Sequence, residues 1–472
     1  MVKKYIIGVL AIALAGCSAK KATVVTPPVT KNSDVAFWLT TGNKSSLLQQ
    51  QNTILNFSTA PNSNPTIDIN EAEKFQTIDG FGYTLTGGSA GLINAMDSKA
   101  KEALLEEIFS AKNNGIAVSY LRISIGASDL SADTFTYNEL PAGVTDINQD
   151  KFSIAKEMTD LVPILKKIVA INPKIKILGS PWTAPTWMKT NNSFKGGSLK
   201  PEYYNSYAKY LVKYIQAMKA EGIAIDAITI QNEPLHPGNV PSMYMEAADQ
   251  AMFVKTALGP VFKSSGIKTK IIVYDHNADR PDYPITILND KDAKQYVDGS
   301  AFHLYAGSIS ALSKVHEAHP DKNVYFTEQW VGGPGKFDED LKWHVSTLII
   351  GATRNWSRNV LEWNLAADPS YGPHTAGGCV TCLGAITVSP AITRNVAYYI
   401  IGHASKFVSP GSVRIASNIP GNLQNVAFKT TEGKKVVIVV NGGTAAQEFN
   451  IKYNGRLIST KLDGGAVGTY VW

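Results

Sequence analysis

The feature that most constrains the fold is an alternation of short apolar runs with longer amphipathic segments, which begins at Asp79. The segment 201–222, for example, has apolar or aromatic residues at helical spacing and ends at Gly222. Eight strands separated by helices within about 300 residues predict an α/β fold, a (β/α)₈ barrel. The candidate strands are 80–86, 119–126, 174–181, 226–234, 270–276, 298–305, 323–329 and 360–365.

A doubly wound parallel sheet is the alternative to this barrel. Such a sheet normally has a glycine-rich phosphate turn after its first strand. The stretch "GFGYTLTGGSAG" does not open a dinucleotide-binding unit of that kind. The alternation therefore favours the barrel.

The two ends of the chain have a different pattern. From residue 426 onward the sequence has strand after strand with Gly/Asn turns and no helical period, which predicts an antiparallel sandwich. The segment 35–77 starts like a strand and lacks partners of its own, so we expect it to join that sheet. The predicted organisation is a barrel at 78–395 with a β-sandwich built from 35–77 and 396–472.

The N-terminus has the pattern of an export signal. Lys3 and Lys4 precede an apolar run too short to span a bilayer, which predicts a signal peptide over 1–16. The ending "LAGC" resembles a bacterial lipobox, in which Cys17 carries the lipid; an ordinary signal with a stray cysteine is the alternative. Residues 17–34 are polar and contain proline, which is typical of a tether. We expect an exported lipoprotein on the periplasmic or cell-surface face of the outer membrane.

The charge of the chain excludes one class of partner. The formal net charge of +6 falls to +4 without the two leader lysines, and no block of Lys and Arg occurs. Nucleic-acid binders carry such blocks. We therefore expect no nucleic-acid partner.

Besides Cys17 the chain has two cysteines, Cys379 and Cys382 in "GGCVTCLG". In an exported protein, a close pair between glycines predicts a small-loop disulfide. A redox C-x-x-C site is the rival, but the strand–motif–helix context of such sites is missing. A zinc site would need two further ligands nearby, and none is evident.

Polar and aromatic residues stand at the carboxyl ends of the predicted strands, where a barrel of this kind places its active site. A single one would be explained by core packing or helix capping, but the pattern recurs from strand to strand. They include Asp129, Trp182, Asn232, Glu233, Asp275, His276, Asn277, His303, Tyr305, Glu328, Trp330, Glu362, Trp363 and Asn364.

Two carboxylates and several tryptophans in one barrel mouth indicate sugar chemistry. Hydrolysis of a glycosidic bond needs one carboxyl to protonate the leaving oxygen and a second to attack or stabilise the sugar carbon. Glu233 and Glu328 are the best pair, because strands four and seven lie on opposite sides of the barrel. A separation of about 5 Å between the two carboxylates would indicate the retaining route. Both functions come from carboxyl groups, so we expect no cofactor and no metal.

The motifs "ITIQNEP" and "YFTEQW" resemble the acid/base and nucleophile motifs of retaining glycosidases with glutamates on strands four and seven. The whole chain is similar to glycoside hydrolase family 30, the family of glucosylceramidases and endo-β-1,6-glucanases. Further motifs carry this resemblance in order: "DGFGYTLTGGSA", "LRISIGASDL", "GSPWTAPTWMKTN", "GSAFHLY", "LEWNLAADPSYGP" and "YYIIGHASKFVSPGSVRI".

The resemblance implies a role for each matching residue. Glu233 would be the general acid/base and Glu328 the nucleophile, with Asn232 on the sugar 2-OH. Arg122 would pair with a catalytic carboxylate and keep it ionised, with a purely structural ion pair as the alternative. The implied substrate-binding residues are Asp129, Trp182, Asn232, His303, Tyr305, Trp330, Trp363 and Asn364.

Two departures from the glucosylceramidases point to one branch of the family. Gly87 stands where those enzymes have an Asp, and the Cys379/Cys382 pair lies in the loop after strand eight. Both features resemble the β-1,6-glucanases, so we expect a monomeric endo-β-1,6-glucanase acting on a β-glucan or glucoside. A glucosylceramidase-like exo-hydrolase and an inactive glycan-binding surface lipoprotein are the alternatives. Xylan is disfavoured, because no arginine matches one for a glucuronic acid branch.

Overall fold

The computed structural model describes Met1 and residues 32–112, 115–389 and 391–472. The rest of the predicted signal peptide, the predicted lipidation site Cys17 and the predicted tether up to residue 31 lie outside the described residues. The ordered fold includes Ser33, whose hydroxyl oxygen accepts a hydrogen bond from the Leu55 N–H at 2.9 Å. Asp34 likewise bonds the backbone of Phe57. Among the described residues, no helix has both the length and the apolar character needed to cross a membrane.

The predicted barrel is confirmed. Within the described chain, eight parallel strands close on themselves in the order β10-β12-β4-β5-β6-β7-β8-β9. One side chain from each of seven of these strands, including Tyr120, Ala227 and Tyr325, forms a separate buried cluster. The period of two along each strand sends these side chains to one face and their neighbours to the other. The strands are β4 (Gly80–Thr84), β5 (Tyr120–Ile125), β6 (Lys176–Pro181), β7 (Ala227–Thr229), β8 (Lys270–Ala278), β9 (Val297–Gly307), β10 (Asn323–Glu328) and β12 (Ser357–Asn364).

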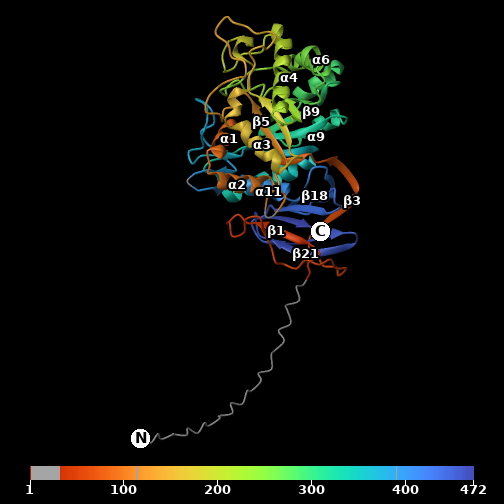
Figure 1. Ribbon diagram of the computed structural model, residues 1–472. Helices are drawn as coiled ribbons and strands as arrows, with labels where there is room; N and C mark the ends of the chain where they lie inside the picture. Colours follow the sequence, from red (N-terminus) through yellow and green to blue (C-terminus); the bar gives the residue numbers. More distant parts are fainter. Residues whose placement is uncertain (2–31, 113–114, 390) are drawn as a thin grey trace.

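Helices surround the barrel (Figure 1). The predicted helix over 201–222 becomes α4, which follows a short 3₁₀ turn and ends before Gly222 at φ +82°. Only glycine adopts this backbone conformation without strain. The helices are α1 (Gly87–Asn94), α2 (Ser98–Phe109), α3 (Leu161–Ile171), α4 (Tyr204–Ala220), α5 (Ala247–Phe253), α6 (Gly259–Ser264), α7 (Asp282–Asn289), α8 (Lys291–Lys294), α9 (Ala311–Ala318), α10 (Phe337–His344) and α11 (Val396–Ser405).

Both chain ends build the second domain, as predicted, but its C-terminal part begins at β17 and not at residue 396, because residues 396–405 form helix α11 in the core shared with the barrel. Nine described strands form one sheet system in the order β2-β1-β22-β19-β18-β17-β3-β20-β21. Figure 1 shows the early strands in red and orange beside the late strands in blue. Their bounds are β1 (Ala36–Thr40), β2 (Gln49–Gln50), β3 (Thr66–Thr77), β17 (Val413–Ser417), β18 (Leu423–Lys429), β19 (Lys435–Asn441), β20 (Gln447–Tyr453), β21 (Arg456–Leu462) and β22 (Val467–Val471).

Strand β19 joins the two domains through its alternating side chains. Val436, Ile438 and Val440 belong to the large core shared with the barrel helices. Val437 and Val439 face the separate core of the sandwich. A strand that is apolar on both faces is typical of a buried central strand. The sandwich is therefore packed against the barrel through a continuous apolar layer.

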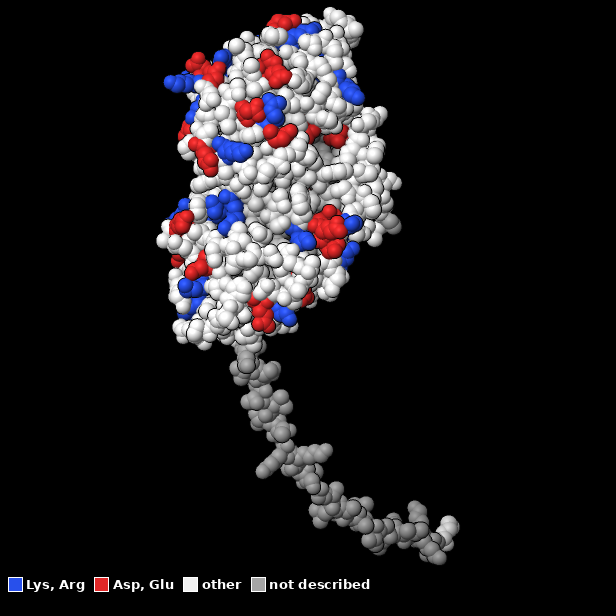
Figure 2. Space-filling view, turned by 180° about the vertical axis from the view of Figure 1, so that it is seen from behind, with Lys and Arg blue, Asp and Glu red and all other residues white. Residues whose placement is uncertain are grey.

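Short strands brace the loops at the barrel mouth. These are β11 (Val331–Gly332), β13 (Ala366–Ala367), β14 (Cys382–Leu383), β15 (Ile386–Thr387) and β16 (Thr393–Arg394). On the outer face shown in Figure 2, acidic and basic side chains are interspersed. A mixed surface of this kind does not form the single-sign field that draws in a nucleic acid.

Candidate active site

The two predicted catalytic glutamates meet at the mouth of the barrel. Glu328 is the last residue of β10, and Glu233 lies in the loop after β7 with a left-handed φ of 46°. A carboxylate oxygen of each, together with a ring nitrogen of His303, lies within 4.8 Å of the others. Retaining glycosidases hold their carboxyl groups about 5–5.5 Å apart, whereas inverting enzymes leave room for a water at about 6.5–9.5 Å. The separation fits the retaining route.

Arg122 lies beneath the pair and is fully buried. Its guanidinium donates to Glu328 Oε2 at 2.6 Å, to Asp275 Oδ2 at 2.8 Å and to Asn232 Oδ1 at 2.6 Å. A buried charge is tolerated only when it is paired and hydrogen-bonded, and these contacts supply both. The guanidinium also lies 4.8 Å from the ring centre of Trp182. Arg122 thus fixes Glu328 and Asn232, the neighbour of Glu233, in one network.

His303 bridges two carboxylates and does not line the cavity. Its Nδ1 lies 3.1 Å from Glu233 Oε1, and its Nε2 lies 3.1 Å from Asp275 Oδ1. Burial lowers the pKa of His303, but Glu328, Asp275 and Glu233 outweigh this and raise it to about 9. His303 is therefore held as a cation between Glu233 and Asp275.

The electrostatics of the two glutamates differ. Burial, Glu233 and Asp275 raise the pKa of Glu328, and His303 and Arg122 oppose the rise. Burial also raises the pKa of Glu233, but the hydrogen bond and charge of His303 outweigh it and leave the pKa below its ordinary value. With Arg122 and His303 cationic and Asp275 anionic, one further negative charge makes the cluster neutral. The site therefore favours a single proton for two glutamates, as the retaining mechanism needs.

Contacts to its carboxylate oxygens stabilise the ionised form of Glu328 and oppose the rise in its pKa. Tyr305 donates its hydroxyl to Glu328 Oε1 at 2.9 Å, and Arg122 binds the other oxygen. Hydrogen bonds to a charged acceptor are among the strongest in proteins and favour the charged form. Tyr305 is 40% exposed as a residue and lines the cavity, so it also forms part of the wall.

Asp275 is a site residue that was not among the predicted catalytic or binding residues. Its carboxylate accepts hydrogen bonds from Thr229 at 2.7 Å and from Thr327 at 2.6 Å, besides the bond from Arg122. Burial raises the pKa of Asp275, but Arg122 and His303 hold it far below the usual range. Asp275 is thus a fixed anion that orients both cations. Its position at the end of a strand was the available signal.

A cavity of about 320 Å³ opens above the glutamates. Most of the predicted binding residues line it, together with the disulfide. Asn364 does not, because its amide oxygen accepts hydrogen bonds from Ser89 at 2.8 Å and Thr86 at 3.3 Å. The lining residues are Asp129, Trp182, Asn232, Glu233, His236, Asn239, His276, Asn277, Tyr305, Glu328, Trp330, Trp363, Cys379 and Cys382.

One wall of the cavity is aromatic with a polar edge. The rings of Trp182 and Trp363 lie 5.5 Å apart at 32°, and the Trp182 indole nitrogen has no partner among the described residues. Burial, Glu328 and Glu233 raise the pKa of Asp129 to about 7. Apolar ring faces beside an unpaired donor and a carboxyl are suited to the C–H faces and hydroxyls of a sugar.

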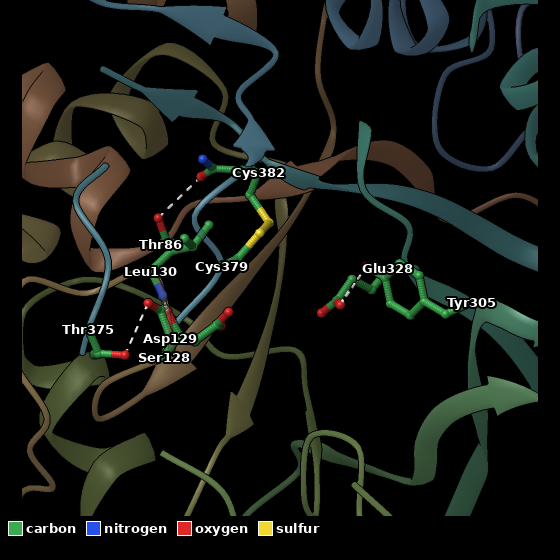
Figure 3. Close-up of a disulfide and its surroundings, with 10 residues drawn as sticks. Thr86, Ser128, Asp129, Leu130, Tyr305, Glu328, Thr375, Cys379 and Cys382 are labelled. Atoms are coloured by element: carbon green, nitrogen blue, oxygen red, sulfur yellow. Dashed lines mark hydrogen bonds between the residues drawn. A yellow bond between two sulfur atoms is a disulfide. The ribbon is translucent and has the colours of Figure 1, made fainter. Parts of the chain in front are cut away.

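Cys379 and Cys382 are joined by a disulfide in the loop after β12 (Figure 3). Cys382 pairs with Gly332 between β14 and β11, which ties this loop to the loop after β10. A Cβ atom on Gly378 would lie 2.3 Å from the Asp129 carbonyl oxygen, so the loop backbone packs directly on that residue. Figure 3 shows Asp129 and the disulfide facing Glu328 across the cavity. The loop is therefore a braced part of the cavity wall.

The metal-binding potential of the described residues is confined to the same cluster. Glu233, His303 and Glu328 bring three donor atoms close enough to chelate an ion. His303, however, lies between Glu233 and Asp275 with one nitrogen directed at each. A metal would have to displace these hydrogen bonds, so the donor set is better suited to holding protons.

Comparisons with known proteins agree with this geometry. The glycosyl hydrolase family 30 TIM-barrel domain matches residues 78–408, and the family's beta sandwich domain matches residues 411–470. An endo-1,6-beta-D-glucanase of Neurospora crassa is 35% identical over 396 residues, which cover 80% of this chain and 81% of the relative. The lysosomal acid glucosylceramidase of Mus musculus is 28% identical over 436 residues, with 86% and 83% covered.

A solved structure, the endo-beta1,6-glucanase BT3312, is 39% identical to the chain. It superimposes with a TM-score of 0.87 over 93% of this chain and 99% of its own. The matched family domains span most of the sequence and contain both glutamates at the barrel mouth. The chain therefore belongs to glycosyl hydrolase family 30.

Proposed function

We propose that the chain is a retaining endo-β-1,6-glucanase that cleaves β-linked glucose polymers by double displacement. The observation that carries the proposal is the facing pair Glu233 and Glu328, with carboxylate oxygens within 4.8 Å. The pair lies in a cavity lined by Trp182, Trp330 and Trp363.

In the first step a Glu328 oxygen attacks the anomeric carbon while Glu233 gives its proton to the glycosidic oxygen. The carbon–oxygen bond to the leaving sugar breaks, and a glycosyl ester on Glu328 forms. Arg122 and Tyr305 hold the attacking carboxylate in place. His303 holds the Glu233 carboxyl in position through their hydrogen bond.

In the second step a water molecule attacks the same carbon from the side that the leaving sugar has vacated. Glu233, now ionised, takes the proton of that water, and the ester bond to Glu328 breaks. Two inversions at one carbon return the β configuration. All protons and charges return to the starting state without any further reagent.

The linkage preference rests on relatives and on the loop after β12. Several relatives at 32–35% identity are endo-1,6-beta-D-glucanases, and the disulfide borders the cavity as expected for that branch. Purified protein should release short gluco-oligosaccharides from pustulan, a β-1,6-glucan. Release of glucose from glucosylceramide with no product from pustulan would move the assignment to the glucosylceramidase-like alternative.

The cellular setting is also a proposal. The leader and the "LAGC" sequence support an exported protein anchored through a lipid on Cys17 in the outer membrane. Labelling of cells with a radioactive fatty acid should mark the wild-type protein and spare Cys17→Ser. Equal labelling of both proteins would exclude this anchor.

A further inference from the structure

One imidazole in the cavity has no part in the chemistry described above. His276 lines the cavity and is 7% exposed, and its Nδ1 has no hydrogen-bond partner among the described residues. Buried polar atoms almost always have partners, so an orphan in a binding cavity calls for a ligand. A 180° rotation of the His276 imidazole about its Cβ–Cγ bond exchanges the positions of ring nitrogen and carbon atoms. A ring nitrogen can therefore face the cavity.

The backbone of β8 is distorted where it delivers this residue. Tyr274 and Asp275 have left-handed φ values of 74° and 66°, and the pairing with β9 shifts between Tyr274 and His276. In a regular strand, Asp275 and His276 would point to opposite faces. The bulge lets Asp275 reach Arg122 inside the barrel while His276 lines the cavity. Left-handed residues cost of order 1–3 kcal/mol each and persist mainly at functional sites.

The strand order places His276 on the acid/base side of the site. In the closed barrel, β7 and β8 lie across from β12 and β4, so His276 faces the wall that holds Trp363. Asn239, in the loop after β7, directs its amide nitrogen at Glu233 Oε2 from 3.4 Å. The leaving sugar is bonded to the oxygen that Glu233 protonates, so that sugar has to lie on this side.

The charge state of His276 suits a neutral sugar. Burial and the cationic His303 lower the pKa of His276 to about 4, with Glu233 opposing the shift. A neutral imidazole offers one donor and one acceptor, as does a sugar hydroxyl. A cation here would compete with His303 for the charge of Glu233.

We propose that His276, together with Asn239, forms the subsite for the leaving sugar and hydrogen-bonds a hydroxyl of the glucose unit whose O6 is released. The assignment rests on the proposed β-1,6-glucanase function and adds the residues that select the leaving group. His276 is here a binding residue and takes no part in proton transfer.

Two substrates with different leaving groups test the assignment. A β-1,6-linked glucotetraose places a sugar in the subsite, whereas 2,4-dinitrophenyl β-glucoside leaves it without one. His276→Ala should lower kcat/KM on the tetraose about 10- to 100-fold, the effect of an unmade hydrogen bond in a closed site, and change the aryl glucoside less than about 3-fold. His276→Gln, which keeps a donor and an acceptor, should recover part of the loss.

The matched control is His319→Ala, which removes a buried imidazole near Lys294, away from the cavity. It should leave both substrates unchanged. Equal losses on both substrates in His276→Ala would overturn the subsite and leave the proposed function standing. A wild-type protein that cleaves the aryl glucoside and ignores the tetraose would instead overturn the β-1,6 assignment and the subsite with it.

Discussion

Replacing Arg122 by Met tests whether this guanidinium tunes the nucleophile or only supports the barrel. The change leaves Glu328 and Asp275 without the cation whose nitrogens lie 2.6 and 2.8 Å away. A cation this close lowers the pKa of a carboxyl by roughly 1–3 units, which is about 1.4–4 kcal/mol. Its loss therefore raises the pKa of Glu328 by that amount.

The direction of the kinetic effect follows from the role of Glu328. The residue attacks only when ionised, so a higher pKa moves the acidic limb of the kcat/KM profile upward by about 1–3 pH units. Below the shifted limb, activity should fall roughly 10- to 1,000-fold relative to wild type. The assay is kcat/KM for an aryl β-glucoside from pH 4 to about pH 9, because this parameter reports ionisations of the free enzyme.

The control is Arg358→Met at the opposite end of the barrel. Arg358 holds Asp79 through hydrogen bonds of 2.9 and 3.1 Å beside the start of β4. Both variants should unfold at lower urea concentrations, and Arg122→Met should lose about 3–5 kcal/mol of unfolding free energy. Only Arg122→Met should move the acidic limb of the kcat/KM profile. An unmoved limb in a folded Arg122→Met protein would refute the tuning role and leave a purely structural ion pair.

Three further predictions concern the carboxylates, the disulfide and a buried histidine. Glu328→Gln should lower kcat by more than roughly 10⁴-fold with an unchanged melting temperature, and full activity of this variant would disprove the mechanism. Glu233→Ala should keep a fast first step on dinitrophenyl glucosides, and azide should accelerate its turnover. Replacing Cys379 and Cys382 by Ala should cost about 2 kcal/mol of unfolding free energy from the short loop and raise KM for glucan about 10-fold, as measured by urea titration and initial rates. Burial lowers the pKa of His403 to about 3. The neutral imidazole therefore contributes its full share of the unfolding free energy above pH 6.5, and this contribution decreases as the pH is lowered, by about 3 kcal/mol at pH 4. His403→Gln should flatten that part of the urea stability profile, and an identical slope in both proteins would contradict it.

The barrel and the glutamate pair were predictable because both follow from local patterns. Each barrel strand is a short apolar run, and parallel strands end in a polar residue at the same edge. Glu328 directly follows Phe326 and Thr327 at the end of β10, so its exposure to the mouth could be inferred from its place in the strand. The sandwich was predictable from the turn-rich tail, since Gly and Asn recur between strand-like runs.

The missed features depend on geometry that no local pattern encodes. The bulge at Asp275 adds one residue to β8 and rearranges which side chains face the interior, and the sequence "VYDHN" has no glycine to mark it. Asn364 lies next to Trp363 in sequence, yet alternation along β12 turns it toward Ser89 and away from the cavity. His303 was predicted to bind the sugar, but its two ring nitrogens contact Glu233 and Asp275 instead. Ion pairs with two carboxylates stabilise a cationic imidazole more than contact with a neutral ligand would.

The pairing of the two chain ends has a consequence for how the protein is made. β1 pairs with β22, and β3 pairs with β17 and β20, so strands synthesised first wait for partners synthesised last. The N-terminal strands leave the ribosome several hundred residues before β22 exists, and contacts at such sequence separation form slowly. A nascent chain therefore carries β1 and β3 without their late partners until β22 has been synthesised. Ribosome-stalled chains that stop before Val467 should be far more sensitive to protease over 36–77 than the completed protein.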